Sequence, residues 1–126
     1  MIEDKTVFAD ALYFATNVIE GQELKDLAVL CGYIGDNVDL QRASVIEFAM
    51  AKPAKVQALA DAPDMKIRAL IERAKSKRII KSKGSILIWA SPTGDLTLGA
   101  DYSEAISKLM KDTDTFGAIE KHLSRK

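Results

Sequence analysis

Apolar residues recur at three- and four-residue steps through the first half of the chain, which is the spacing of amphipathic helices. Such steps predict a first helix over residues 6–20, and Gly21 stands where a left-handed residue would end it. The pattern repeats over residues 22–31, with Gly32 as the next stop signal. These two segments predict an αα-hairpin.

Three further helices follow from the same spacing. Residues 32–39 lack periodicity and predict a loop, with Asp39 capping a helix over residues 40–51. Pro53 breaks that helix, but its fixed φ suits the first turn of a short helix that ends near Ala60. After a turn at residues 61–64, Asp64 is the expected N-cap of a helix over residues 65–76. The inward stripe of that helix is Ile67, Leu70, Ile71 and Ala74.

The periodicity changes after Lys77, where β-branched and aromatic residues predict strands. Residues 78–80 and 85–89 flank a polar segment, residues 81–84, and so predict a hairpin with a basic turn; residues 96–98 predict a third short strand. The spacing of Asp101 and Glu104 is that of a capping box and predicts a helix there, and a last helix is expected over residues 115–123. The expected fold is α+β, mostly α, with six or seven helices and one small antiparallel sheet at residues 78–98.

Length and composition favour one soluble domain. The chain has 126 residues, of which 48% are hydrophobic and 29% charged, enough to bury an ordinary core. We expect a single domain over residues 1–126, with parts at 1–51, 53–98 and 101–126. The single cysteine excludes an internal disulfide, the N-terminus lacks the pattern of a secretory signal, and no apolar run reaches about 20 residues. These observations predict a cytoplasmic protein that does not enter membranes.

The net charge of zero conceals a strongly basic segment. Residues 66–83 hold eight of the 18 cations and one of the 18 carboxylates, Glu72. A helix and hairpin this rich in cations favour phosphate binding. The alternatives are a solvated helix face beside a buried stripe and a surface for an acidic protein. The candidate phosphate-binding residues are Lys66, Arg68, Arg73, Lys75, Lys77, Arg78, Lys81 and Lys83.

The expected mode of binding is contact with the phosphate backbone. Base reading requires Arg, Asn or Gln on the helix face opposite the core, where the wheel of residues 65–76 places Ala69, Glu72 and Ser76. The cations flank the buried stripe instead. They can therefore hold DNA or RNA without reading its sequence.

Two resemblances accompany this pattern. The segment PAKVQALADAPDMKIRALIERAKSKRIIKSKGSILIW, residues 53–89, resembles a winged helix-turn-helix in its order of elements, its apolar positions and its basic turn. That resemblance implies a DNA-binding fold whose second helix enters the major groove. The Lys-rich chain, with its Trp-bearing hairpin ahead of LGADYSEAISKLM, also resembles small proteins of tailed bacteriophages. This second resemblance implies a virion or accessory component, in the virion or the host cytoplasm.

No motif for catalysis, metal or cofactor binding stands out. Trp89 is read as a core residue, with base stacking as its alternative, and Cys31 as a small buried hydrophobe, with a reactive thiol as its alternative. His122, the only histidine, is expected to add positive character to a helix end. Residues 112–117 imitate the start of a calcium loop but lack its later ligands. The aromatic residues on helical stripes are expected in the core: Phe8, Tyr13, Phe14, Phe48 and Phe116.

Three functions remain open. The first is a non-enzymatic nucleic-acid-binding module with an accessory or regulatory role. The second is a structural or protein-interaction role, as a homo-oligomer or with another protein, because aliphatic residues surround most of the helix over residues 40–51. An enzyme is the third, and the lack of convergent titratable groups argues against it.

Overall fold

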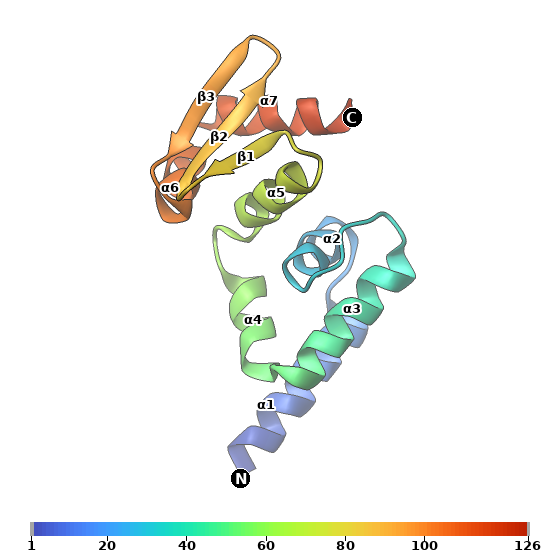
Figure 1. Ribbon diagram of the computed structural model, residues 1–126. Coiled ribbons are helices and arrows are strands. Elements are labelled where there is room, and N and C mark those ends of the chain that lie inside the picture. Colours follow the sequence, from blue (N-terminus) through green and yellow to red (C-terminus); the bar gives the residue numbers. More distant parts are fainter. Residues whose placement is uncertain (1, 126) are drawn as a thin grey trace. The chain divides into compact units, whose positions relative to one another are not determined.

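The computed structural model describes the backbone of residues 2–125 and the side chains of residues 6–125. Within that range the chain forms seven α-helices, one π-helical segment and one three-stranded sheet (Figure 1). The fold is α+β and mostly α, as predicted. Contacts divide the chain into two compact units, here called the N-terminal unit (Met1–Ala69) and the C-terminal unit (Leu70–Lys126). Every helix within residues 2–125 is too short or too polar to traverse a lipid bilayer.

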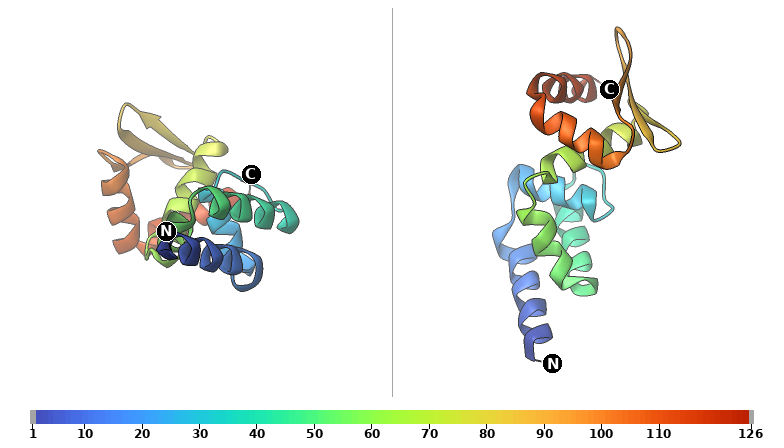
Figure 2. Two further views of the ribbon diagram at one scale, coloured as in Figure 1. Left: turned by 90° about the horizontal axis from the view of Figure 1, so that it is seen from below. Right: turned by 90° about the vertical axis from the view of Figure 1, so that its left-hand side faces the viewer.

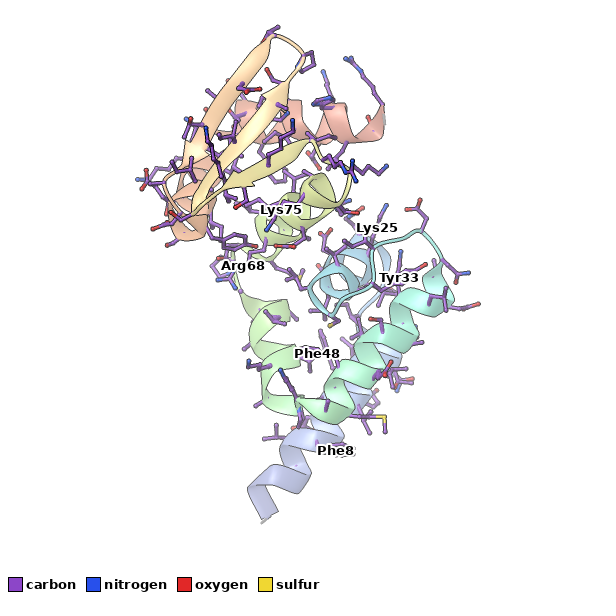
Figure 3. All side chains as sticks on the ribbon, viewed as in Figure 1. Phe8, Lys25, Tyr33, Phe48, Arg68 and Lys75 are labelled. Atoms are coloured by element: carbon purple, nitrogen blue, oxygen red, sulfur yellow. The ribbon has the colours of Figure 1, made fainter. Side chains whose placement is uncertain are left out.

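The N-terminal unit is a small helical assembly. It contains α1 (Ile2–Tyr13), the π-helical segment Phe14–Val18, α2 (Gly21–Leu30), α3 (Val38–Ala51), α4 (Pro53–Asp61) and the start of α5 (Met65–Ser76). α2 packs on α3, while α1 and α3 both pack on α4. Their shared core includes Leu24, Leu27, Val45, Ala49 and Val56, with Phe14, Tyr33 and Phe48 partly buried against it (Figure 3).

The first predicted helix continues to Val18, but its last turn is π-helical. The Ile19 amide donates to the Phe14 carbonyl, five residues back, at 3.1 Å. This geometry leaves nearby carbonyls to be satisfied by other donors. Arg42 of α3 supplies them, since its Nη1 donates to the carbonyl of Ala15 at 2.8 Å and of Thr16 at 3.3 Å. Gly21 is left-handed, with φ of 65°, but it does not end this helix: Ile19 is the C-cap, and Gly21 begins α2.

Three predictions for this unit are wrong. The N-cap of α3 is Asn37, whose side chain accepts from the Leu40 amide at 3.1 Å, and Asp39 lies in the first turn instead. Phe8 and Tyr13 are not core residues, because 37% of Phe8 and 64% of Tyr13 remain exposed. The remaining three aromatic residues of that set are half-buried. The helix break at Pro53 is confirmed.

The C-terminal unit is a three-stranded antiparallel sheet with helices on one face. The strands are β1 (Ile80–Lys83), β2 (Ile86–Ser91) and β3 (Gly94–Gly99), in the spatial order β1-β2-β3. α6 (Tyr102–Lys111) packs on β2 and β3, and α7 (Thr113–Ser124) packs on β2 and α6 (Figure 2). The inner face of the sheet consists of Ile80, Leu87, Trp89 and Leu98, all buried, together with Leu96.

The hairpin turn lies later than predicted. Lys81 and Lys83 belong to β1, and Lys83 pairs with Ile86, so only Gly84 and Ser85 form the turn. Gly84 has a φ of 63°, which permits so tight a connection. The expectation of a basic turn is therefore wrong: its two lysines lie on an edge strand.

The two last helices begin with aspartate caps. Asp101 accepts from the Glu104 amide at 2.8 Å, which confirms the predicted N-cap of α6. Asp112 accepts from the Thr115 amide at 3.1 Å and from the Thr115 hydroxyl at 2.6 Å. These hydrogen bonds hold the pKa of Asp112 below its ordinary value. The calcium-loop imitation at residues 112–117 is thus a helix start.

Candidate nucleic-acid interface

Five of the eight predicted phosphate-binding residues belong to the C-terminal unit and are exposed. They occur in one short stretch: one in the last turn of α5, two directly after the helix and two on β1. Among the described residues, none of the five takes part in an ion pair or a side-chain hydrogen bond. We call them the basic stretch: Lys75, Lys77, Arg78, Lys81 and Lys83.

Arg78 occupies a backbone conformation that usually selects glycine. Its φ is 61°, the one positive value at a non-glycine position within residues 2–125. The Arg78 amide donates to the Lys75 carbonyl at 3.1 Å, and the Ile79 amide donates to the Ala74 carbonyl at 2.8 Å. This is the Schellman pattern that ends α5, with arginine at the position where glycine is preferred. A left-handed non-glycine residue costs about 1–2 kcal/mol, so arginine at this position carries a local conformational cost.

The two lysines of β1 lie on the open face of the sheet. Lys81 pairs with Ile88 and Lys83 with Ile86, so these four side chains share the face opposite Trp89. Ile86 is 39% exposed, and Ile88 is half-buried. Lysines on an edge strand also discourage pairing with another sheet, which is their simplest structural role. The result is an open sheet face with two lysines along its β1 edge.

The other three predicted residues do not join this stretch. Lys66 and Arg68 lie in the N-terminal unit, and Arg68 Nε donates to Asp64 Oδ2 at 2.8 Å, near the start of α5 (Figure 3). Asp64, which was expected to cap α5, forms this ion pair with Arg68. Arg73 belongs to the C-terminal unit but is half-buried, and its Nε is shielded from solvent.

The expected outward face of α5 is also partly wrong. Ala69 is fully buried, and Glu72 is half-buried. The apolar stripe of α5 is therefore wider than the wheel of Ile67, Leu70, Ile71 and Ala74 indicates. This face offers even less room for contacts with base edges than the sequence predicted.

Trp89 is a core residue, as predicted, with 8% of its surface exposed. Its Nε1 donates to His122 Nδ1 at 3.1 Å, a contact that spans 33 residues and has no local sequence signal. Cys31 is half-buried, and burial raises the pKa of its thiol from 9.0 to about 12. Within residues 6–125, no cluster of His, Cys, Asp and Glu side chains is suited to hold a metal ion.

Comparisons with protein-family models, with curated proteins and with solved structures found no match to this chain. The order of α4, turn, α5 and hairpin is present as expected, but α4 packs on α1 and α3. The resemblances to winged helix-turn-helix proteins and to bacteriophage proteins therefore stay predictions. The function has to be argued from the geometry and the charges of the chain itself.

Proposed function

We propose that the protein is a non-enzymatic module that binds the phosphate backbone of nucleic acids through its C-terminal unit. The observation that carries this proposal is the basic stretch, five exposed cations without ionic partners among the described residues. Such cations bind phosphates by displacing condensed counterions, a gain that needs no deep pocket. Lys75, Lys77 and Arg78 would approach from the end of α5, while Lys81 and Lys83 would approach from β1.

The distribution of charge between the two units supports the same proposal. The C-terminal unit holds eleven cations and seven carboxylates, for a net charge of +4. The N-terminal unit holds seven cations and eleven carboxylates, for a net charge of −4. A phosphate backbone is therefore attracted to one unit and repelled by the other.

The proposed contacts would hold a nucleic acid by its backbone without reading its base sequence. Lysine dominates the basic stretch and acts as a flexible point charge, whereas base reading in a groove uses bidentate side chains. Trp89 is buried and is not available to stack on a base from the open face. Affinity should therefore vary little among oligonucleotides of equal length and strongly with salt.

Fluorescence polarisation with labelled duplex and single-stranded oligonucleotides tests this function. With about four phosphates engaged, affinity should fall on the order of a hundredfold between about 50 and 200 mM salt. The double variant Lys81→Glu with Lys83→Glu should bind every sequence more weakly. It should also reduce the slope of log affinity against log salt concentration by about two. The matched control, Lys52→Glu with Lys55→Glu, reverses two exposed lysines of the N-terminal unit and should leave affinity within about twofold. Lack of binding at low salt, or equal loss in both double variants, would contradict the proposal.

A second candidate function, protein interaction, has its own supporting observation. The N-terminal unit leaves large apolar side chains more than half exposed on several helices, at Tyr13, Val18, Val38, Leu40 and Met50. Exposed apolar surface of this kind favours contact with another protein or with a second copy of the chain. A role as a structural or accessory component of a bacteriophage particle would be one form of it. Light scattering over a range of concentrations tests self-association, which the nucleic-acid proposal does not require.

A further inference from the structure

A groove of about 460 Å³ lies within the C-terminal unit, between the β2–β3 hairpin and the second half of α7. Its hairpin wall comes from residues 91–96, and its helix wall includes Lys121, His122 and Arg125. The basic stretch does not line it. The volume falls in the range of sites for small organic molecules.

The floor of the groove is an extension of the inner face of the sheet. Leu96 pairs with Trp89 across β2 and β3, so both side chains point to the side covered by α6 and α7. Trp89 is buried, but 39% of Leu96 remains exposed. An apolar side chain on the inner face is thus left uncovered and offers a surface to a planar apolar group.

The hydrogen bond from Trp89 fixes the donor that His122 presents. An indole N–H can only donate, so His122 Nδ1 accepts, and in the neutral imidazole the proton is on Nε2. The two rings are inclined at 53° with centroids 6.2 Å apart. His122 therefore presents an N–H donor at Nε2, and its orientation is held by a residue of the sheet.

Two cations flank this donor. Lys121 and Arg125 are four residues apart and so lie on one face of the last turns of α7, where like charges repel each other. Both are exposed, and neither takes part in an ion pair among the described residues. Cations at a helix C-terminus also complement the helix dipole. The dipole does not account for an open groove with an apolar floor beside them.

We propose that this groove binds a planar organic anion, with its ring system on Leu96 beside the edge of Trp89 and its anionic group at Lys121, His122 and Arg125. Carboxylates and phosphates share the required chemistry, since both accept several charge-assisted hydrogen bonds. Asp95, the one carboxylate among the described residues that line the groove, lies on the hairpin wall and would disfavour a second anionic group at that end. The proposal is independent of nucleic-acid binding because it uses other residues.

The indole N–H resonance of Trp89 provides the test, since Trp89 is the only tryptophan of the chain and its N–H faces the groove residue His122. The probes are two matched pairs, adenosine monophosphate with adenosine and 2-naphthoate with 2-naphthamide. At least one anion should shift the resonance saturably, with its neutral partner binding about tenfold more weakly or worse. If only adenosine monophosphate binds, phosphate is the preferred anionic group; if only 2-naphthoate binds, carboxylate is preferred.

Two double variants separate this site from the nucleic-acid surface. Lys121→Gln with Arg125→Gln should weaken binding of the anion about tenfold or more. Lys81→Gln with Lys83→Gln should leave it unchanged while weakening oligonucleotide binding. The proposal is overturned if neither anion shifts the resonance, if each neutral partner binds as well as its anion, or if the first double variant binds like the unmodified protein.

Discussion

Gly99 lies at the end of β3, where the backbone passes close to α6. A Cβ atom at this position would lie 2.5 Å from the Ala105 amide nitrogen and 2.9 Å from the Glu104 carbonyl carbon. Both are backbone atoms, so the clash cannot be relieved by a rotamer change. We expect Gly99→Ala to lower the free energy of unfolding by about 1–3 kcal/mol, measured by urea denaturation.

Gly117 is the matched control for this prediction. It lies inside α7, and a Cβ atom there would have no neighbour within 4 Å. Alanine favours the helix over glycine, so Gly117→Ala should raise the free energy of unfolding by about 0.5–1 kcal/mol. Opposite signs for the two substitutions are expected. If Gly99→Ala were as stable as the unmodified protein, the close approach of β3 and α6 would be wrong.

Cys31 should be a slow nucleophile in the folded protein. Burial raises the pKa of its thiol from 9.0 to about 12, so much less thiolate is present at about pH 8 than in the unfolded chain. Alkylation by iodoacetamide, followed by mass spectrometry, should be on the order of a hundredfold slower in buffer than in concentrated urea. Equal rates would show that the thiol is open to solvent. The sequence predicted a buried, unreactive thiol because Cys31 shares the apolar stripe of α2.

At the end of α5, one residue adopts a backbone conformation that its side chain disfavours. Arg78 is left-handed in a Schellman motif where glycine carries no steric cost. Arg78→Gly should therefore stabilise the protein, by about 1 kcal/mol or less after the entropy of glycine is counted. Thermal unfolding measures this change.

The same substitution tests why the arginine is there. If Arg78 contacts phosphate, Arg78→Gly should weaken oligonucleotide binding severalfold while raising thermal stability. Arg78→Ala is the control, since it removes the charge but keeps the left-handed strain. We expect both variants to bind oligonucleotides more weakly, and only Arg78→Gly to be more stable than the unmodified protein. Unchanged binding in both would remove Arg78 from the proposed surface.

The elements were largely predictable because their signals are local. Pro53, Gly32 and the spacing of Asp101 and Glu104 mark helix boundaries through their own backbone chemistry. The predicted boundaries of the elements were wrong where several residues could serve equally well as a cap or a turn. Asn37 and Asp39 are both good caps, and the polar run at residues 81–84 suits a turn as well as an edge strand rich in lysine.

Features made by distant residues could not be predicted. The π-helical turn depends on Arg42, which reaches the Ala15 carbonyl from another helix. The groove depends on Trp89 and His122, which only the folded sheet and α7 bring together. Burial of Ala69 is likewise a property of tertiary packing, since nothing in the helical wheel distinguishes it from an exposed alanine.

In the whole molecule, the separation of a basic segment from an acidic remainder could be seen in the sequence. The residue at which the acidic unit ends and the basic unit begins could not. The basic segment at residues 66–83 crosses the division between the two units, which lies within α5. Lys66 and Arg68 thus fall in the acidic unit, and the basic stretch begins at Lys75. This placement removes Lys66 and Arg68 from the proposed surface, and the partial burial of Arg73 removes a third residue, so five of the eight remain.

Hydrogen–deuterium exchange tests that narrower surface in the intact protein. Amides on the outer edge of β1 have no neighbouring β-strand among the described residues, so their hydrogen exchange is open to solvent. A nucleic acid bound along β1 should slow this exchange. With a saturating duplex oligonucleotide, we expect added protection at residues 77–83 and no change from α1 to α4. The double variant Lys81→Glu with Lys83→Glu should abolish this protection under the same conditions. Protection confined to the helices of the N-terminal unit would instead place the nucleic acid on the acidic half of the chain and contradict the electrostatic basis of the proposed function.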